Sequence, residues 1–287
     1  MASAQAVSDQ ITSAFSNLPR SQKLVARFVV DNQYFVAFAS VAEVAQKAGV
    51  SAATVVRFCQ TLGYEGYPHL QAAIRQGFSR FMTTAQRLEE RLTAPVSEDD
   101  VLAQAFSTDI NNIKYTIELI DPVTFRAAVD EISRAAAILV VGGGISAPPA
   151  LFLSHSLQVI GFPVRVVTSG GIPLSLELSA LKPGDLLICI GFWRYFREAV
   201  ATMRWAREVG VTRIAITDSE VSPLAQLADY AFVTTTDSIG HSVSPLASIA
   251  LVDAFVAALS FRRPEKTLAA LRKVDMAYNE SNLLLEG

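Results

Sequence analysis

The segment Gly142-Gly143-Gly144-Ile145-Ser146 contains the residue types that could hold an anion. Glycines let the backbone approach a ligand closely, and a helix that begins just after them offers free N–H groups and the positive end of its dipole. Ser146 adds a hydroxyl at that point. The spacing lacks the third glycine of a dinucleotide-binding fingerprint. The pattern therefore favours a phosphate or a carboxylate, unless the glycines only form a tight turn with Ser146 as the helix cap.

The segment 191–198 combines aromatic rings with two arginines, in the order Gly-Phe-Trp-Arg-Tyr-Phe-Arg-Glu. Guanidinium groups hold phosphate or carboxylate through paired hydrogen bonds, and a ring can stack on the apolar face of a ligand. Alternatively, Trp193 and Phe196 belong to a core or an interface, and the arginines pair with Glu198 or with a partner chain. The residues that we expect to bind a ligand are Gly143, Gly144, Ser146, Ser169, Arg194, Tyr195, Arg197, His241 and Ser244.

The polar segment 237–245 precedes a predicted helix. Ser244 fits the N-cap of that helix with Pro245 as its first residue, and His241 either touches a ligand or a neighbouring subunit, or is an ordinary loop histidine. His69 and His155 have no acidic or cysteine neighbours at the spacing of metal ligands, so we expect no metal site. We also expect no cofactor and no catalytic residue.

Two short helices near the N-terminus fit a helix-turn-helix. Ser40 and Glu43 form a capping box before the first helix, and Gly49 provides its stop. Ser51 caps the second helix, which ends at Gly63.

The second of these helices has two distinct faces. The periodicity directs Val55, Phe58, Cys59 and Leu62 to a core. The other face carries Ala52, Ala53, Thr54 and Arg57, so it is small near the N-terminus and ends with a guanidinium. Small residues let a helix enter the major groove, Thr can contact a thymine methyl, and Arg can grip guanine or phosphate. The alternative is a plain helical hairpin with a solvated arginine. The residues that we expect to contact DNA are Arg20, Lys23, Ser40, Ser51, Ala52, Ala53, Thr54, Arg57, Tyr64 and Tyr67.

Charge is unevenly distributed along the chain. Residues 10–80 hold seven basic and three acidic side chains, a net of +4, which leaves −7 for the rest of a chain whose formal charge is −3. A small basic module on an acidic body suggests that the module meets a polyanion. A difference of this size could also arise by chance.

Length and composition indicate about two globular domains. The chain has 287 residues, of which 51% are hydrophobic and 18% charged, so disordered and fibrous classes are excluded. Cys59 and Cys189 are too few for a disulfide framework or a cysteine-rich zinc site, and we expect buried, reduced thiols. Glycines and prolines interrupt the apolar run 135–164, which argues against a membrane span. The N-terminus shows no signal-peptide pattern, and we expect a cytoplasmic protein without membrane contact.

The second half of the chain alternates short apolar strands with helices. We expect strands at 136–141, 164–167, 185–190, 213–217 and 230–234, and helices at 150–160, 196–209, 223–228 and 245–260. Such an alternation predicts a five-stranded, doubly wound parallel sheet, whose ligands sit beyond the carboxyl ends of the strands. Between the two regions, residues 82–122 are predicted to be helical, with Ser97 capping a helix that runs to about Ile120.

The chain resembles the RpiR/MurR type of transcriptional regulator over nearly its whole length. The segments that carry the resemblance are 50–59 (Val-Ser-Ala-Ala-Thr-Val-Val-Arg-Phe-Cys), 62–67 (Leu-Gly-Tyr-Glu-Gly-Tyr), 142–146, 216–219 (Ile-Thr-Asp-Ser) and 222–225 (Ser-Pro-Leu-Ala). The resemblance implies an all-α helix-turn-helix domain at 1–82, a helical linker at 83–122, an α/β sugar isomerase (SIS) domain at 123–262 and a helical tail at 263–287. In this family the SIS domain typically binds a sugar phosphate and mediates dimer or tetramer contacts.

One segment departs from the family pattern. SIS domains usually carry a Ser-x-Ser-Gly-x-Ser/Thr loop after the third strand, whose hydroxyls hold phosphate, and here the segment 191–198 replaces it. A phosphate could still be held by guanidinium groups, and a sugar acid or another carboxylate is equally compatible.

The leading hypothesis is a ligand-responsive transcription factor that is not an enzyme. Its expected partners are double-stranded operator DNA, an anionic sugar-derived effector and further copies of the chain, as a homodimer or homotetramer. One alternative is a phosphosugar isomerase or etherase, for which Glu198 and His241 are the nearby candidates for a general base. Another is a scaffold whose SIS-like fold only oligomerises.

Overall fold

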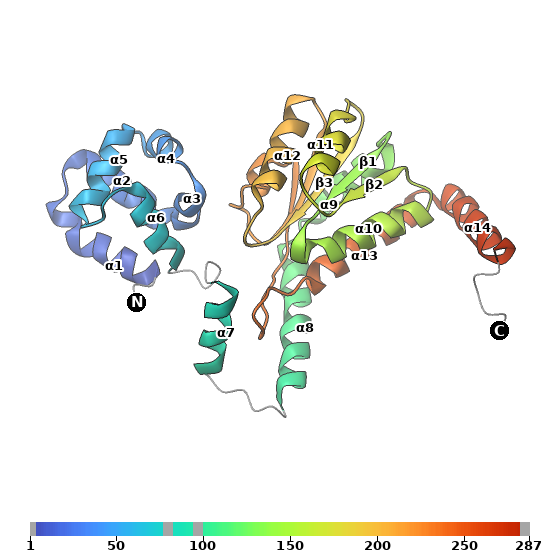
Figure 1. Ribbon diagram of the computed structural model, residues 1–287, viewed down its shortest axis with the longest axis horizontal. Coiled ribbons are helices and arrows are strands. Elements are labelled where there is room, and N and C mark those ends of the chain that lie inside the picture. The colour runs from blue at the N-terminus through green and yellow to red at the C-terminus, as the bar shows by residue number, and fades with distance from the viewer. Residues whose placement is uncertain (1–3, 77–82, 94–99, 282–287) are drawn as a thin grey trace. The chain divides into compact units, whose positions relative to one another are not determined.

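The computed structural model describes residues 4–76, 83–93 and 100–281 (Figure 1). Backbone contacts divide the chain into two units, Met1–Pro95 and Val96–Gly287, and each unit has its own core. The linker boundary that we predict at residue 82 and the cap at Ser97 lie outside the described residues.

The N-terminal unit is helical. Its elements are α1 (Ala4–Ala14), η1 (Phe15–Asn17), α2 (Arg20–Asp31), α3 (Gln33–Phe38), α4 (Val41–Ala48), α5 (Ala52–Thr61), α6 (Tyr67–Gln76) and α7 (Thr84–Thr93). Buried side chains of α1 to α6 form one core, with Val25, Val44, Val55 and Phe58 fully inaccessible. The helix-turn-helix expected from the sequence is confirmed as α4, a turn at Gly49 in the left-handed conformation, and α5.

The C-terminal unit is built on a five-stranded sheet in the order β2-β1-β3-β4-β5, with every neighbouring pair parallel. The strands are β1 (Ile138–Val141), β2 (Val164–Val167), β3 (Leu186–Gly191), β4 (Thr212–Thr217) and β5 (Tyr230–Val233). This confirms the predicted α/β class. The register aligns Val141 with Val167 and Cys189, so the loops that follow β1, β2 and β3 meet at one edge of the sheet.

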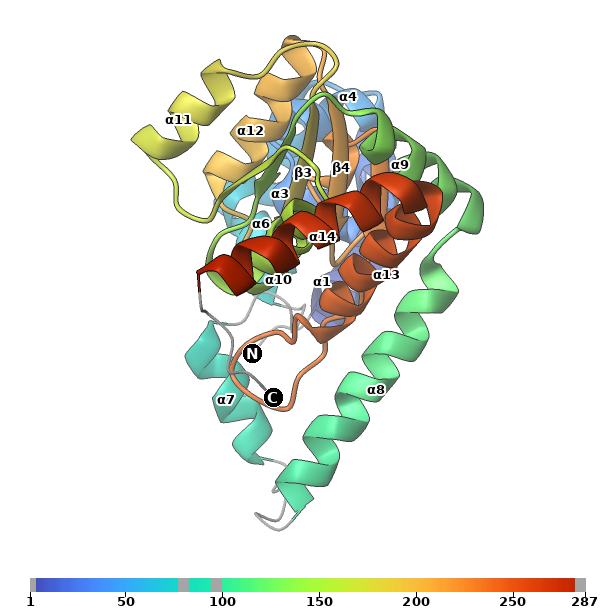
Figure 2. The same ribbon diagram turned by 90° about the vertical axis from the view of Figure 1, so that its right-hand side faces the viewer.

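Helices cover both faces of this sheet (Figure 2). The covering elements are α9 (Pro122–Arg134), α10 (Ala147–Val159), α11 (Ile172–Ser179), α12 (Arg197–Glu208) and α13 (Leu246–Arg262). Helices α10 and α13 pack together on one face, and α11 and α12 pack together on the other. The central strands are therefore buried on both sides, which explains why their sequences are continuously apolar.

Two further helices flank these layers. Helix α8 (Val101–Leu119) packs against α13, and α14 (Pro264–Glu280) packs against α10 and α13. None of the helices among the described residues is long and apolar enough to cross a bilayer.

Several predicted boundaries shift by one or two residues. Strand β1 begins at Ile138, and the helix expected at 223–228 is the single turn η5 (Ala225–Leu227). Helix α13 begins at Leu246, so its N-cap is Pro245 and not Ser244 as predicted, although the hydroxyl of Ser244 accepts the N–H of Leu246 at 3.3 Å. Helices α9 and α11 were not predicted from the sequence as separate helices.

Candidate functional site

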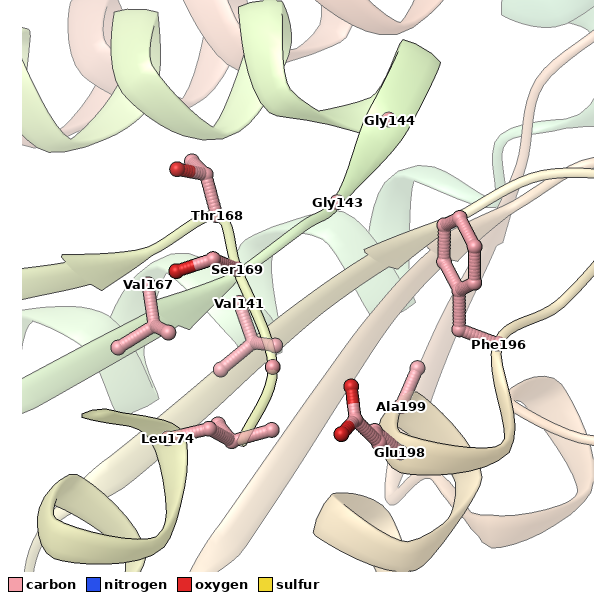
Figure 3. Close-up of a pocket in the computed structure, with 11 residues that line it drawn as sticks. Val141, Gly143, Gly144, Val167, Thr168, Ser169, Leu174, Phe196, Glu198 and Ala199 are labelled. Atoms are coloured by element: carbon pink, nitrogen blue, oxygen red, sulfur yellow. The ribbon is translucent and has the colours of Figure 1, made fainter. Parts of the chain in front are cut away.

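A pocket of about 140 Å³ opens at the carboxyl edge of the sheet. It lies between the loops that follow β1 and β2 and the first turn of α12 (Figure 3). The residues that line it are Val141, Gly143, Gly144, Val167, Thr168, Ser169, Gly170, Leu174, Phe196, Glu198 and Ala199. This is the edge where ligands of parallel α/β sheets bind.

The glycine segment after β1 is closely packed. A Cβ on Gly142 would lie 2.7 Å from the carbonyl oxygen of Ser146, and Gly144 has φ +58°. A Cβ on Gly143 or Gly144 would lie about 3.4–3.5 Å from the ring of Phe196. The loop thus needs glycine for its own fold, and the Phe196 ring rests against it.

Glu198 places a carboxylate in the pocket. Its Oε1 accepts the backbone N–H of Gly171 at 3.0 Å, at the start of α11. The same carboxylate lies against Gly170, where a Cβ would be only 1.5 Å from Oε2. In Figure 3 Phe196 and Glu198 stand on one side of the pocket, and Thr168 and Ser169 stand on the other.

The pocket contains only part of the predicted ligand-binding set. Gly143, Gly144 and Ser169 line it, whereas Ser146 is buried beneath the loop and its side chain makes no capping hydrogen bond to α10. Phe196 and Glu198, which also line the pocket, were not among the predicted binding residues. Phe196 was expected in a core or an interface, and Glu198 either in an ion pair or as the general base of an enzyme. The other five predicted ligand-binding residues do not line this pocket: Arg194, Tyr195, Arg197, His241 and Ser244.

The segment between β3 and α12 is held by Asp218, which follows β4 and is buried. Asp218 accepts the backbone N–H of Trp193 at 3.2 Å and the hydroxyl of Tyr195. Between them, Arg194 has φ +68° and its guanidinium lies 4.8 Å from the centre of the Trp193 ring. The arginine side chain is exposed, and Trp193 is buried beneath it.

The loop after β5 is held by α8. Asn112, which is 2% exposed, donates to the carbonyl oxygen of Asp237 at 2.7 Å and accepts the N–H of Asp237 at 3.1 Å. Thr116 accepts the N–H of Thr235 at 3.0 Å. His241 is exposed farther along this loop.

The described residues contain no group of three His, Cys, Asp or Glu side chains that could hold a metal ion. Cys59 and Cys189 are both buried and unpaired, which agrees with the reduced thiols that we expect.

The second candidate site is the outer face of α5. Ala52, Ala53 and Arg57 are exposed on it, as expected, and Gln60 extends the same face by one turn. Gln60 was not among the predicted DNA contacts, although a glutamine side chain can form hydrogen bonds to adenine. The prediction that Thr54 shares this face is wrong, because Thr54 is 7% exposed and its hydroxyl bonds to that of Ser51 at 2.9 Å.

The remaining predicted DNA contacts divide into exposed and structural residues. Arg20 and Lys23 lie on the first turn of α2, and Ser40 lies in a complete capping box with Glu43. Tyr64 is partly buried, and its hydroxyl bonds to Gln10 at 2.8 Å. Tyr67 is buried, and its hydroxyl lies within 2.9 Å of two backbone carbonyl oxygens, so its side chain belongs to the core.

Comparison with known proteins identifies both units. A model of the helix-turn-helix domain of the rpiR family matches residues 5–80, and a model of the SIS domain matches residues 131–262. The crystal structure of the sugar isomerase domain of an RpiR transcription factor from Sphaerobacter thermophilus is 43% identical, covers 62% of this chain and 99% of that one, and has a TM-score of 0.61. The chain belongs to the RpiR family of transcription factors.

Two relatives match this RpiR protein along nearly its whole length. The HTH-type transcriptional regulator HexR of Pseudomonas aeruginosa is 28% identical over 278 residues, which are 93% of each chain. The structure of the Vibrio vulnificus NanR protein complexed with ManNAc-6P is 21% identical, covers 98% of this chain and 100% of that one, and has a TM-score of 0.66. The NanR structure therefore has the same fold along its chain, with the helical unit before the α/β unit.

Proposed function

We propose that this RpiR protein binds operator DNA through α5 and senses an anionic sugar derivative, a sugar phosphate or a sugar acid, through its SIS domain. Binding of the effector changes the affinity for the operator because the two ligands favour different states of the protein. The protein acts as a homodimer or homotetramer in the cytoplasm, without catalysis.

The observation that carries the DNA-binding part is the exposed face of α5. Helix α5 has small residues at its start and Arg57 one turn later, and its opposite face is anchored in the core by Val55 and Phe58. A helix with this arrangement can approach base edges in the major groove while its domain holds it rigidly.

The sensing part is supported by the pocket at the carboxyl edge of the SIS sheet. The pocket is lined by glycines of the loop after β1, by Thr168 and Ser169, and by the aromatic ring of Phe196. The NanR protein of Vibrio vulnificus, which is similar along the whole chain, forms a complex with ManNAc-6P, and this supports a phosphorylated sugar as one class of effector.

Mutation of Arg57 tests the DNA-binding part. We expect Arg57→Ala to weaken binding to a duplex from the protein's own promoter region by about 1–3 kcal/mol, if Arg57 reads a base. A mobility-shift titration measures the affinity, and Arg272→Ala, which removes an exposed arginine of α14, is the matched control. Unchanged affinity for Arg57→Ala would count against α5 as the recognition helix.

The sensing part needs a separate measurement. We expect a member of a panel of sugar phosphates and sugar acids to raise the melting temperature and to shift the mobility-shift titration at the same concentration. A panel that leaves both unchanged would favour a scaffold whose SIS fold only assembles subunits.

An enzyme is the second candidate, and Glu198 is the observation that favours it. A carboxylate inside the pocket could act as the general base of a phosphosugar isomerase or etherase. Conversion of an aldose or ketose phosphate, followed by NMR and abolished in Glu198→Gln, would establish this function instead.

A further inference from the structure

The pocket at the carboxyl edge of the SIS sheet carries negative charge. Its lining, among the described residues, includes the Glu198 carboxylate and no Lys or Arg. Glu198 already accepts the N–H of Gly171, at the positive end of α11. A phosphate or carboxylate group placed there would have to displace Glu198 or approach it against like-charge repulsion.

The glycine loop after β1 is covered by an aromatic ring where it borders the pocket. The Phe196 ring lies against Gly143 and Gly144 and so covers this part of the glycine loop. The polar side chains of the lining are the Glu198 carboxylate and, on the opposite side of the pocket, Thr168 and Ser169. Such a lining suits the C–H face and the hydroxyls of a sugar better than a hydrated anion.

Arg194 supplies a positive charge on the segment that leads from β3 to the pocket residue Phe196. Among the described residues it is the one non-glycine with a positive φ, a conformation that glycine would adopt without strain. Its guanidinium is stacked on Trp193 and pairs with none of the carboxylates in the described part of the chain. Phe196, which lines the pocket, is two residues away, a backbone span of about 7 Å at most.

Asp218 fixes the position of this arginine. Because Asp218 binds the chain on both sides of Arg194, through Trp193 and Tyr195, the strained residue cannot relax by moving the segment. The exposed guanidinium lies over the indole, 4.8 Å from the ring centre, where its N–H groups can form paired hydrogen bonds to an oxyanion.

We propose that the effector binds with its uncharged, hydroxyl-bearing end in the pocket, where its hydroxyl groups donate hydrogen bonds to Glu198, and with its anionic group outside, on Arg194. Arg194 and Glu198 are then the specificity-determining residues, and Asp218 is the positioning residue of Arg194. This inference rests on the proposed sensing function of the SIS domain but does not depend on DNA binding.

The test uses inorganic phosphate with the full-length chain at constant ionic strength. Broadening of the phosphorus NMR line measures binding, and in a Trp205→Phe background the emission of Trp193, then the single tryptophan, reports whether the ion lies beside Arg194. We expect Arg194→Gly to weaken phosphate binding by about tenfold or more, and Glu198→Gln to change it by less than about threefold. Arg204→Gln, which removes an exposed arginine of α12, is the control and should leave binding unchanged.

Melting temperatures separate a binding role of Arg194 from a structural one. Because glycine adopts the left-handed conformation freely, we expect Arg194→Gly to raise the melting temperature while it removes phosphate binding. The proposal is overturned if Glu198→Gln strengthens phosphate binding tenfold while Arg194→Gly does not affect it, or if the wild-type protein shows no phosphate binding. A lowered melting temperature of Arg194→Gly with unchanged phosphate binding also overturns it.

Discussion

At the scale of single residues, burial changes the acidity of the two thiols. Burial raises the pKa of Cys59 and of Cys189 from about 9 to about 12. In the unfolded chain a thiol ionises near pH 9, whereas in the folded chain it stays neutral. The folded state is thus fully favoured below pH 9 and loses this advantage as the pH rises from about 9 towards 12.

This linkage predicts a pH-dependent stability. We expect the melting temperature to fall as the pH rises from 8.5 to 10, a range about the pKa of the unfolded thiol. The fall should be less steep in Cys189→Ala than in the wild type. The slope is the relevant quantity, because removing a sulfur from β3 also lowers stability at every pH. Equal slopes in the two proteins would mean that Cys189 ionises equally in the folded and unfolded states.

Residue chemistry alone predicted some DNA contacts poorly, because a hydroxyl group can bind DNA or form a hydrogen bond inside its own domain. Tyr67 and Thr54 carry hydroxyls that could bind DNA, but both are buried and both hydroxyls satisfy groups inside the N-terminal unit. The sequence could place Val55 and Phe58 in the core because apolar spacing is unambiguous. For hydroxyl-bearing residues, only the neighbours along the fold decide the role.

At the scale of elements, the loop after β1 depends on one glycine more than on its neighbour. A Cβ at Gly142 would meet the backbone oxygen of Ser146 at 2.7 Å, and backbone cannot move away as a side chain can. A Cβ at Gly143 would make ordinary contacts of 3.4 Å or more. We expect Gly142→Ala to destabilise the protein by about 1–3 kcal/mol, as other overpacked sites do.

Denaturant unfolding of Gly142→Ala and Gly143→Ala measures this difference. The Gly143→Ala variant is the matched control, with a change within about 0.5 kcal/mol. Equal losses in both variants would mean that the loop is limited by backbone freedom and not by the contact with Ser146.

Helix α8 holds the loop after β5 through two side chains. Because Asn112 is buried and exchanges two hydrogen bonds with the backbone of Asp237, its replacement leaves both backbone groups unpaired. We expect Asn112→Ala to raise hydrogen exchange in residues 235–244, and Asn111→Ala, an exposed neighbour on α8, to leave it unchanged. Unchanged protection of that loop in Asn112→Ala would show that the hydrogen bonds of Asn112 do not hold it.

Strands were easier to predict than helices in the SIS domain. All five strands fall within two residues of their predicted positions, because strands buried on both faces are short, continuous apolar runs. Helix α11 lacks a comparably clear sequence pattern. Ile172 and Leu176 are 77% and 65% exposed, so apolar residues stand on its outer face as well as its inner face and the helical period disappears.

At the scale of the whole molecule, the sequence predicted two domains and their classes from a change of rhythm. Helical spacing in the first eighty residues gives way to alternating strands and helices, and each pattern corresponds to one unit with its own core. The pocket residues were harder to predict because Phe196 and Glu198 gain their roles only where α12 meets the loops that follow β1 and β2. That meeting is set by the register of the sheet and leaves no mark in the local sequence.

Oligomerisation, which we expect from the family, has a candidate surface on α8. Large apolar side chains repeat along one side of this helix, with Leu102, Phe106, Ile110, Ile113 and Ile117 between 42% and 73% exposed. At about 100° per residue these positions fall within one stripe. A contiguous apolar stripe of this kind is typical of an interaction surface, and a second copy of α8 would offer the same stripe in return, as a two-fold symmetric contact requires.

We therefore predict that a charge in the middle of this stripe separates the subunits. Phe106→Glu should shift the mass measured by light scattering towards the monomer, because burying an unpaired carboxylate in an apolar contact costs several kcal/mol. Gln104→Glu adds the same charge on the opposite side of α8 and should leave the mass unchanged. Operator affinity should fall with the mass, since two half-sites are read by two linked subunits. A Phe106→Glu protein that keeps the wild-type mass would place the subunit contact elsewhere on the SIS domain.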